Sequence, residues 1–343
     1  MESFPDLGQR VRTHLCYAQV FQDALTQAEL VARCDPAKPN LVERELTLLR
    51  AEGAIERVGD YWFLRGHGVP DWSTIKRTKE GLTRDVLDAN RSLLGLLTRL
   101  PMVRMLAVSG SFARGHPVPN REKPLDLDLF AVTSPSGVHV VRIIVKVSKT
   151  ITALLAALRL TSKRPLPCLN FTTESTFLEI TNQSFFTASD ALYVTVVKGK
   201  PEYQRFLAAN SWITRYYPVE LDAPLPSENG KDSRRLGHTA LNLVCFAILA
   251  ALSWVRNRGA GRPFPYAIEF RWDKKHCLRR GTGFSGGGYQ PQVARRFCEI
   301  YRRHFGAQEQ LWEFLFPGTT DAGVRVNGTN APSTHTLPLG YDE

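Results

Sequence analysis

Two short apolar segments near the middle of the chain constrain its fold more than any other feature. Residues 103–109 predict one strand, and residues 125–130 predict a second strand that carries Asp126 and Asp128. Because side chains alternate across a strand, the two aspartates should point to the same side, about 7 Å apart. Two carboxylates held together repel each other unless a cation lies between them, so the pattern favours a Mg²⁺ or Mn²⁺ site. The alternative is an acidic pair that faces solvent at a strand edge.

The turn after the first predicted strand suits a phosphate. Gly110 lets the backbone approach a ligand closely, and Ser111 with the nearby N–H groups can donate hydrogen bonds to phosphate oxygens. Arg114 is placed to add a bidentate contact. Arg142 belongs to a basic face of the next predicted helix, where it either receives the phosphates or faces solvent.

These residues resemble a known family. The Gly-Ser turn, the Ala-Arg-Gly at 113–115 and the Asp-Leu-Asp at 126–128 look like the signature of the DNA polymerase beta-type nucleotidyltransferase superfamily. The motif core covers about residues 106–132, and a looser similarity to bacterial nucleotidyltransferase-domain proteins covers about residues 80–215. The resemblance implies an α/β (α+β) fold with a mixed sheet, which binds a nucleoside triphosphate with two Mg²⁺ ions. It also implies transfer of a nucleoside monophosphate to an acceptor hydroxyl, with release of pyrophosphate.

The chain departs from the family pattern at the third carboxylate. Polymerising and transferring members carry this acid on a later strand, whereas the segment 169–171 has the amide Asn170 at its centre. The segment 178–180 has an apolar-acid-apolar pattern, which makes Glu179 the substitute candidate. Either Glu179 or Asn170 would then complete the site on the acceptor side. A non-catalytic regulator that binds a nucleotide and contacts DNA or a protein partner is therefore the alternative function.

Residues 1–68 predict a winged helix-turn-helix module. Three helices are expected, over about 9–24, from a capping box that starts at Thr26, and from Asn40, followed by a hairpin around Gly59-Asp60. The first 70 residues hold eight Lys or Arg and ten Asp or Glu. Because a DNA-binding surface normally needs an excess of cations, a scaffolding or protein-contact role is favoured over DNA binding.

A long helix over about 73–100 opens the predicted nucleotidyltransferase domain, which spans residues 72–215. Residues 216–316 predict a C-terminal helical region with basic loops, and the Gly-, Thr-, Asn- and Pro-rich residues 317–343 predict a disordered tail. Within the C-terminal region, the apolar run 239–255 is somewhat short for a membrane span and has arginines on both flanks. It predicts a helix buried on all sides.

The net charge of +11 lies outside the first 70 residues and indicates an anionic partner. Aromatic side chains interleaved with the cations of the C-terminal region make RNA a possible acceptor, although a solvated basic surface is equally compatible. The six cysteines form no metal-binding or disulfide pattern, and the N-terminus lacks a signal peptide. We therefore expect a cytoplasmic protein with no membrane contact.

Overall fold

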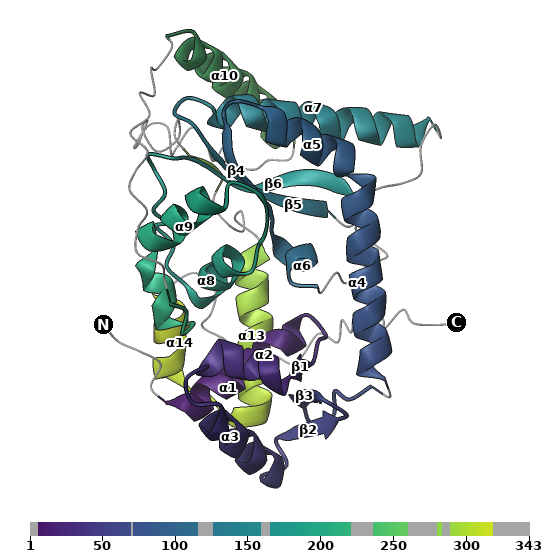
Figure 1. Cartoon of the computed structure of the whole chain (residues 1–343), viewed down its shortest axis with the longest axis vertical. Helices are drawn as coiled ribbons and strands as arrows, with labels where there is room; N and C mark the ends of the chain where they lie inside the picture. Colours follow the sequence, from purple (N-terminus) through teal and green to yellow (C-terminus); the bar gives the residue numbers. More distant parts are fainter. Residues whose placement is uncertain are drawn as a thin grey trace.

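The computed structural model describes residues 6–69, 71–115, 126–158, 165–220, 236–259, 280–282 and 289–317. Helices and two separate sheets make up this part of the chain (Figure 1), as expected for a mixed α/β protein. The sequence-based expectation of an α+β class is thus confirmed. Residues 260–279, which hold many of the C-terminal cations and aromatics, and residues 318–343 of the tail lie outside the described residues.

The N-terminal module contains three helices and a three-stranded antiparallel sheet of order β1-β3-β2. Its elements are α1 (Leu7–Val20), β1 (Leu25–Thr26), α2 (Gln27–Cys34), α3 (Pro39–Ala51), β2 (Ile55–Val58) and β3 (Tyr61–Leu64). This order of helices, followed by a hairpin, is the one predicted from the sequence. The cluster that fills the module is made of apolar residues from all three helices and the sheet.

Local chemistry explains where these elements begin and end. Thr26 and Glu29 form the predicted capping box at the start of α2, and Gly53, at φ +72°, ends α3 in a left-handed conformation. The bounds of two helices differ from the prediction. Helix α1 stops at Val20 and not near residue 24, because the chain turns at Gln22. Helix α3 opens at Pro39, one residue before the predicted Asn40.

The long helix expected over 73–100 is two helices, α4 (Trp72–Ala89) and α5 (Arg91–Arg99). Asn90 separates them. Its side-chain amide donates hydrogen bonds to the carbonyl oxygens of Val86, at 3.0 Å, and Pro165, at 3.4 Å. An asparagine that bonds the backbone in this way competes with the regular helical pattern, which ends the first helix.

The larger sheet is mixed, with strand order β7-β4-β5-β6-β8. Its strands are β4 (Val103–Val108), β5 (Asp126–Thr133), β6 (Leu166–Glu174), β7 (Thr195–Lys198) and β8 (Arg280–Thr282). Only β5 and β6 are parallel, and helix α7 (Val138–Ala157) provides the crossover between them. The two strands predicted to carry the site, β4 and β5, are antiparallel neighbours at the centre of the sheet.

Helices cover both faces of this sheet (Figure 1). Leu127, Leu129 and other apolar residues face a cluster that includes side chains of α4, α5 and α7. Phe130 and Phe171 face the opposite cluster, which includes side chains of α8 (Phe185–Leu192), α9 (Lys200–Ala209) and the 3₁₀ turn Ser211–Arg215. The alternation of burial along β5 therefore assigns each of its side chains to one face.

The second cluster also joins the sheet to the N-terminal module. Leu15 of α1, Phe185 of α8 and Phe297 of α13 (Tyr289–Phe305) belong to one continuous buried core, completed by α14 (Glu309–Leu315). Helix α4 makes a second connection because it runs from the module to the sheet (Figure 1). The module thus packs directly against the rest of the chain.

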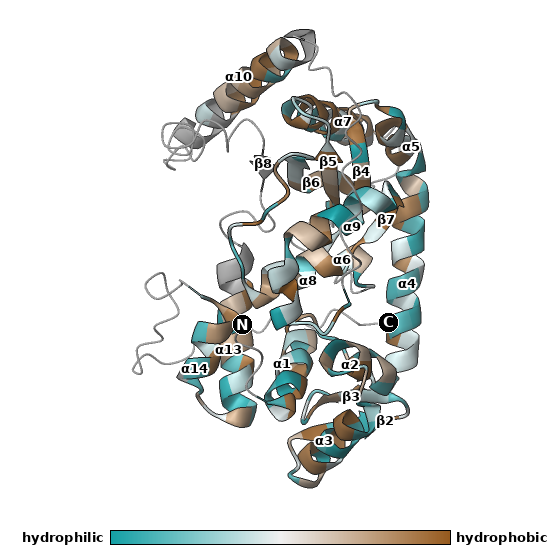
Figure 2. Cartoon of the chain, turned by 60° about the vertical axis from the view of Figure 1, so that its left-hand side comes forward, coloured by the Kyte–Doolittle hydropathy of each residue, from teal (hydrophilic) through white to brown (hydrophobic). Residues whose placement is uncertain are grey.

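The apolar run near residues 239–255 lies on helix α10 (Leu236–Gly259), which packs, among the described elements, against one side of α7. Cys245 and Leu249 are buried there, whereas Val244 is 56% and Ile248 46% exposed. The prediction of a helix buried on all sides was therefore wrong. Figure 2 shows the apolar residues along α10 and α7. Within the described residues, no helix has the length and hydropathy required to cross a membrane.

Candidate functional site

Strand β5 places Asp126 and Asp128 on the same side of the sheet. Leu127 and Leu129, which alternate with them, are fully buried on the opposite face. Asp126 is exposed at the first residue of the strand, and Asp128 is half-buried one step further in. The strand thus presents one carboxylate to solvent and holds its neighbour in a partly enclosed position.

The Gly-Ser turn touches the same carboxylate. The N–H of Ser109 donates to the carbonyl oxygen of Asp128 at 2.9 Å, and helix α6 (Gly110–Ala113) begins at the next residue. Gly110 has φ +70°, and a Cβ built on it would overlap Oδ2 of Asp128. Only glycine fits this conformation and this close approach. Ser111 follows as a partly exposed residue of α6.

Asp128 lies among other acids. Burial, followed by the charges of Asp190 and Asp126, raises its pKa to about 7, against the opposing effect of Arg114 and Lys149. Asp190 belongs to α8 and is only 6% exposed. It is a third acid near the pair that the sequence did not indicate. Its helix has no fixed spacing from the motif, and the structure brings the two together only through packing.

The cations around the site are paired with its acids. Lys149 of α7 donates from Nζ to Oδ1 of Asp126 at 3.2 Å. Arg142 is close enough to affect the pKa of Cys168, the β6 residue that pairs with Asp128. The basic face expected on α7 is thus only partly at the site, and His139, three residues before Arg142 on the same helix, is fully buried.

Arg114 faces away from solvent. Its Nη1 donates to the hydroxyl of Tyr17 at 2.7 Å, and its Nη2 forms an ion pair with Oδ1 of Asp190. The side chain is 8% exposed, so this arginine is held inside the protein. Its expected contact with a phosphate stays a prediction.

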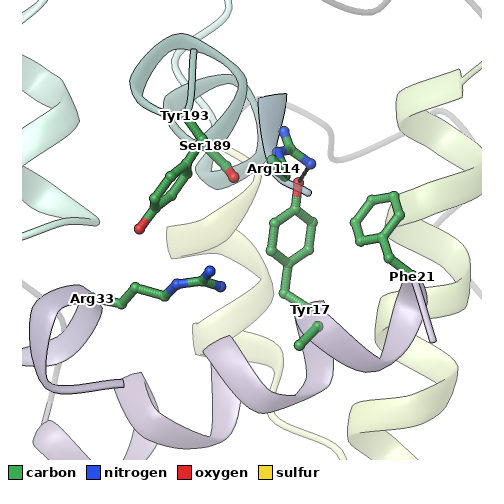
Figure 3. Close-up of a pocket in the computed structure, with 7 residues that line it drawn as sticks. Tyr17, Phe21, Arg33, Arg114, Ser189 and Tyr193 are labelled. Atoms are coloured by element: carbon green, nitrogen blue, oxygen red, sulfur yellow. Dashed lines mark hydrogen bonds between the residues drawn. The ribbon is translucent and has the colours of Figure 1, made fainter. Parts of the chain in front are cut away.

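A small pocket surrounds this arginine, between the N-terminal module and α8 (Figure 3). Figure 3 shows the Tyr17 ring below the guanidinium of Arg114, with Phe21 beside it and Arg33 facing Tyr193. The lining residues come from α1, α2 and α8 and from the residues that directly follow α1, α6 and α8, namely Tyr17, Ala18, Phe21, Arg33, Arg114, Ser189 and Tyr193. The candidate site therefore borders directly on the module.

The two candidates for the acceptor side lie in different places. Asn170 is the extra residue at a register shift, since Leu129 pairs with Leu169 and Phe130 with Phe171. It lies on β6 near the acidic pair. Glu179 is an exposed residue of the loop that follows β6. Strand β6 ends at Glu174, which pairs with Thr133, the last residue of β5. Thr133 is roughly 16 Å along β5 from Asp128. Within this described segment, Glu179 lies in a loop and on no strand.

The acidic pair fits a metal ion that is shared with a phosphate ligand. Among the described residues, no three His, Cys, Asp or Glu side chains are grouped so that they could hold a metal by themselves. Mg²⁺ in phosphate-transfer sites is usually bound by one or two carboxylates together with the phosphates of the substrate. Asp126 and Asp128, on one side of one strand, provide that donor set.

Comparison of the chain with protein-family models, with curated proteins and with solved structures finds no match.

Proposed function

We propose that the protein is a metal-dependent nucleotidyltransferase, which moves a nucleoside monophosphate from a nucleoside triphosphate to an acceptor hydroxyl. The main support for this proposal is the contact between the Gly110 turn and Asp128. A glycine turn that opens a helix suits a phosphate, and a carboxylate pair suits a divalent cation. Their meeting at one point supports a site for a metal-bound triphosphate.

Each residue at the site has a proposed role. Asp126 and Asp128 would hold Mg²⁺ or Mn²⁺, which, when bound, neutralises phosphate charge and helps to orient in-line attack. Gly110 and Ser111 bind the triphosphate through the turn. Lys149 and Arg142 balance its negative charge from α7, and Asn170 lies on the neighbouring strand toward the acceptor.

The reaction forms a bond from the acceptor oxygen to the α-phosphorus. The bond from that phosphorus to the bridging oxygen of pyrophosphate breaks, and the hydroxyl proton is released to solvent. The acceptor is RNA, a small molecule or a protein side chain. The excess of positive charge outside the first 70 residues supports RNA.

Incubation of the full chain with Mg²⁺ or Mn²⁺ and each α-labelled nucleoside triphosphate tests the proposal. Total RNA, metabolites and proteins are offered as acceptors in parallel. Label should move to one of these pools with the native protein and with Asp85→Asn, which removes an exposed acid of α4. It should not move with Asp128→Ala.

Absence of transfer to every pool would contradict the proposed activity. If a nucleotide still bound in a metal-dependent way under those conditions, the regulator alternative would be favoured. That alternative also predicts binding of duplex DNA with a steep dependence on salt.

A further inference from the structure

Two histidines that are far apart in the sequence lie next to each other where the N-terminal module meets helix α13. His67 belongs to the segment that follows β3, and His304 is the last residue but one of α13. Their ring centroids are 5.4 Å apart, and the ring planes are tilted by 53°. Because α13 packs against α1 (Figure 1), the fold brings the two rings together.

The backbone fixes the position of both histidines. Gly66 has φ +77°, a conformation that glycine adopts readily, and the N–H of His67 donates to the carbonyl oxygen of Leu64 at 3.1 Å. His304 is held in the last turn of α13. Both histidines are half-buried, so the protein sets their positions while a small solute can still reach them.

One nitrogen of each ring is available to a ligand, as far as the described residues show. Gln19 of α1 is 8% exposed, and its amide Nε2 lies 3.0 Å from Nδ1 of His67, which leaves Nε2 as the second nitrogen of that ring. Nε2 of His304 is buried and has no hydrogen-bond partner among the described residues. A buried polar atom of this kind is explained most simply by an ion or a water that binds there.

The spacing of the rings suits a shared metal ion. Zn²⁺ binds imidazole nitrogens at about 2.0–2.1 Å in tetrahedral geometry, which places the centroids of two ligand rings roughly 5 Å apart. The observed 5.4 Å is close to this value. The contact from Gln19 to Nδ1 of His67 also fits, because a metal-binding histidine usually has its other nitrogen bonded to a protein group that orients the ring.

The charges nearby restrict the kind of ion. Burial, followed by the charges of Arg303 and Arg296, lowers the pKa of His67, and burial is also the main cause that lowers the pKa of His304. A neutral imidazole is the form that binds a metal. The same arginines repel any cation, although Arg303 is exposed and its charge is screened by solvent. An ion that bonds strongly to imidazole nitrogen, such as Zn²⁺, Cu²⁺ or Ni²⁺, is therefore favoured over Mg²⁺.

We propose that His67 and His304 form a second metal site, which binds one Zn²⁺ or a similar divalent transition metal through one nitrogen of each ring. Among the described residues, no third His, Cys, Asp or Glu joins the pair, so water completes the coordination. The site shares no residue with the acidic pair and does not depend on the proposed nucleotidyl transfer. A bound ion would fasten the N-terminal module to α13 and thereby stabilise the folded chain.

Titration of the full chain with Zn²⁺ at neutral pH, measured by calorimetry, tests the proposal, with thermal unfolding of the same samples in the presence and absence of Zn²⁺. We expect one Zn²⁺ per chain to bind and to raise the melting temperature. His67→Gln and His304→Gln should each abolish this binding and this rise. Gln19→Leu should weaken the binding roughly tenfold, as loss of a group that orients a ligand does.

Two control variants separate this site from other effects. Gln308→Ala deletes a different contact between the module and the C-terminal helices, the hydrogen bond from Nε2 of Gln9 to Oε1 of Gln308 at 2.9 Å. It should bind Zn²⁺ as the native protein does. Asp128→Asn changes the acidic pair and should also keep the binding that depends on the two histidines.

Three outcomes would overturn the proposal. If the histidine variants bind Zn²⁺ as tightly as the native protein, the pair is no metal site. If Gln308→Ala loses as much affinity as they do, the loss reflects a loosened contact between the module and the C-terminal helices. If Asp128→Asn alone abolishes the binding, Zn²⁺ binds to the acidic pair. None of these outcomes bears against nucleotidyl transfer, and failure of the transfer assay would leave the histidine site unaffected.

Discussion

Two aspartates of this protein, Asp23, which is fully buried, and Asp128, which is half-buried, have opposite surroundings. Asp23, between α1 and β1, is fully buried and has two cations nearby, with Nζ of Lys76 at 3.9 Å and Nζ of Lys79 at 4.0 Å. Asp128, on β5, lies near two acids, Asp126 and Asp190. Burial raises the pKa of Asp23 to about 6, and the two lysines limit the rise. Burial and like charge together raise the pKa of Asp128 to about 7.

The contrast distinguishes an acid with a structural role from an acid with a functional role. Asp23 joins the N-terminal module to α4, which carries both lysines, so its charge is compensated within the fold. Asp128 is repelled by the two neighbouring acids, and a bound cation would offset this repulsion. Perturbed acids grouped beside a turn are typical of functional sites, whereas a compensated acid is typical of a structural contact.

Of the two aspartates, Asp128 should have the larger effect on activity when its carboxylate is removed. In a nucleotidyl-transfer assay, Asp128→Ala should lower turnover by about 10³-fold or more, because a metal supplies several kcal/mol of transition-state stabilisation. Asp23→Ala should keep its activity per folded molecule. Comparable losses in the two variants would remove the distinction between the two acids.

For stability, unlike activity, we expect the larger loss from Asp23→Ala. Asp23→Ala leaves Lys79, whose side chain is 5% exposed, without its buried carboxylate. Breaking a buried pair in this way should lower the free energy of unfolding by about 3 kcal/mol in urea titration. Asp60→Ala removes an 88% exposed partner of Arg57 in the hairpin, and should cost less than about 0.5 kcal/mol. A loss of similar size in the two variants would show that Asp23 is not a structural acid.

Asp128→Asn should make the protein more stable in the absence of metal. The raised pKa means that the folded state holds a proton that the unfolded state has lost. The native protein therefore loses stability relative to Asp128→Asn as pH rises from about 4 to about 7, and the difference then stays constant. Urea titrations at pH 4 and pH 8 should show a relative change of about 4 kcal/mol in favour of the variant. The absence of a pH-dependent difference would mean that Asp128 is ionised normally.

Metal affinity should follow the same ionisation. With a pKa of about 7 for Asp128, the ionised fraction rises from about one tenth at pH 6 to about nine tenths at pH 8. Mn²⁺ should therefore bind about tenfold more tightly at pH 8, because the ligand must be deprotonated. Tyr193→Phe should show the same pH dependence as the native protein. Affinity that stays constant over this range would exclude Asp128 as the group that controls binding.

Features set by neighbouring residues could be predicted from the sequence. The Thr26 capping box, the hairpin around Gly59 and the strand that aligns Asp126 with Asp128 all depend on local backbone preference and side-chain alternation. Each of these predictions was confirmed. None of them requires knowledge of a contact between distant parts of the chain.

Features set by distant contacts could not be predicted. Asn90 divides a helix through a bond to Pro165, and Asp190 approaches Asp128 because α8 packs below the sheet. Arg114 was expected to face a ligand, since the sequence does not show that Tyr17 lies beside it. Periodicity also gave the wrong surroundings for α10, because an apolar run does not reveal how many neighbours cover it.

Because α13 packs against α1, the core around α1 can be completed only after α13 has been synthesised. Helix α1 is synthesised long before α13, which covers part of its apolar side and is one of the last described helices. Until α13 emerges, Leu15 and its neighbours remain open to water or to other chains. The N-terminal module is therefore made early but finished late, and chaperones would have their longest opportunity to bind at α1.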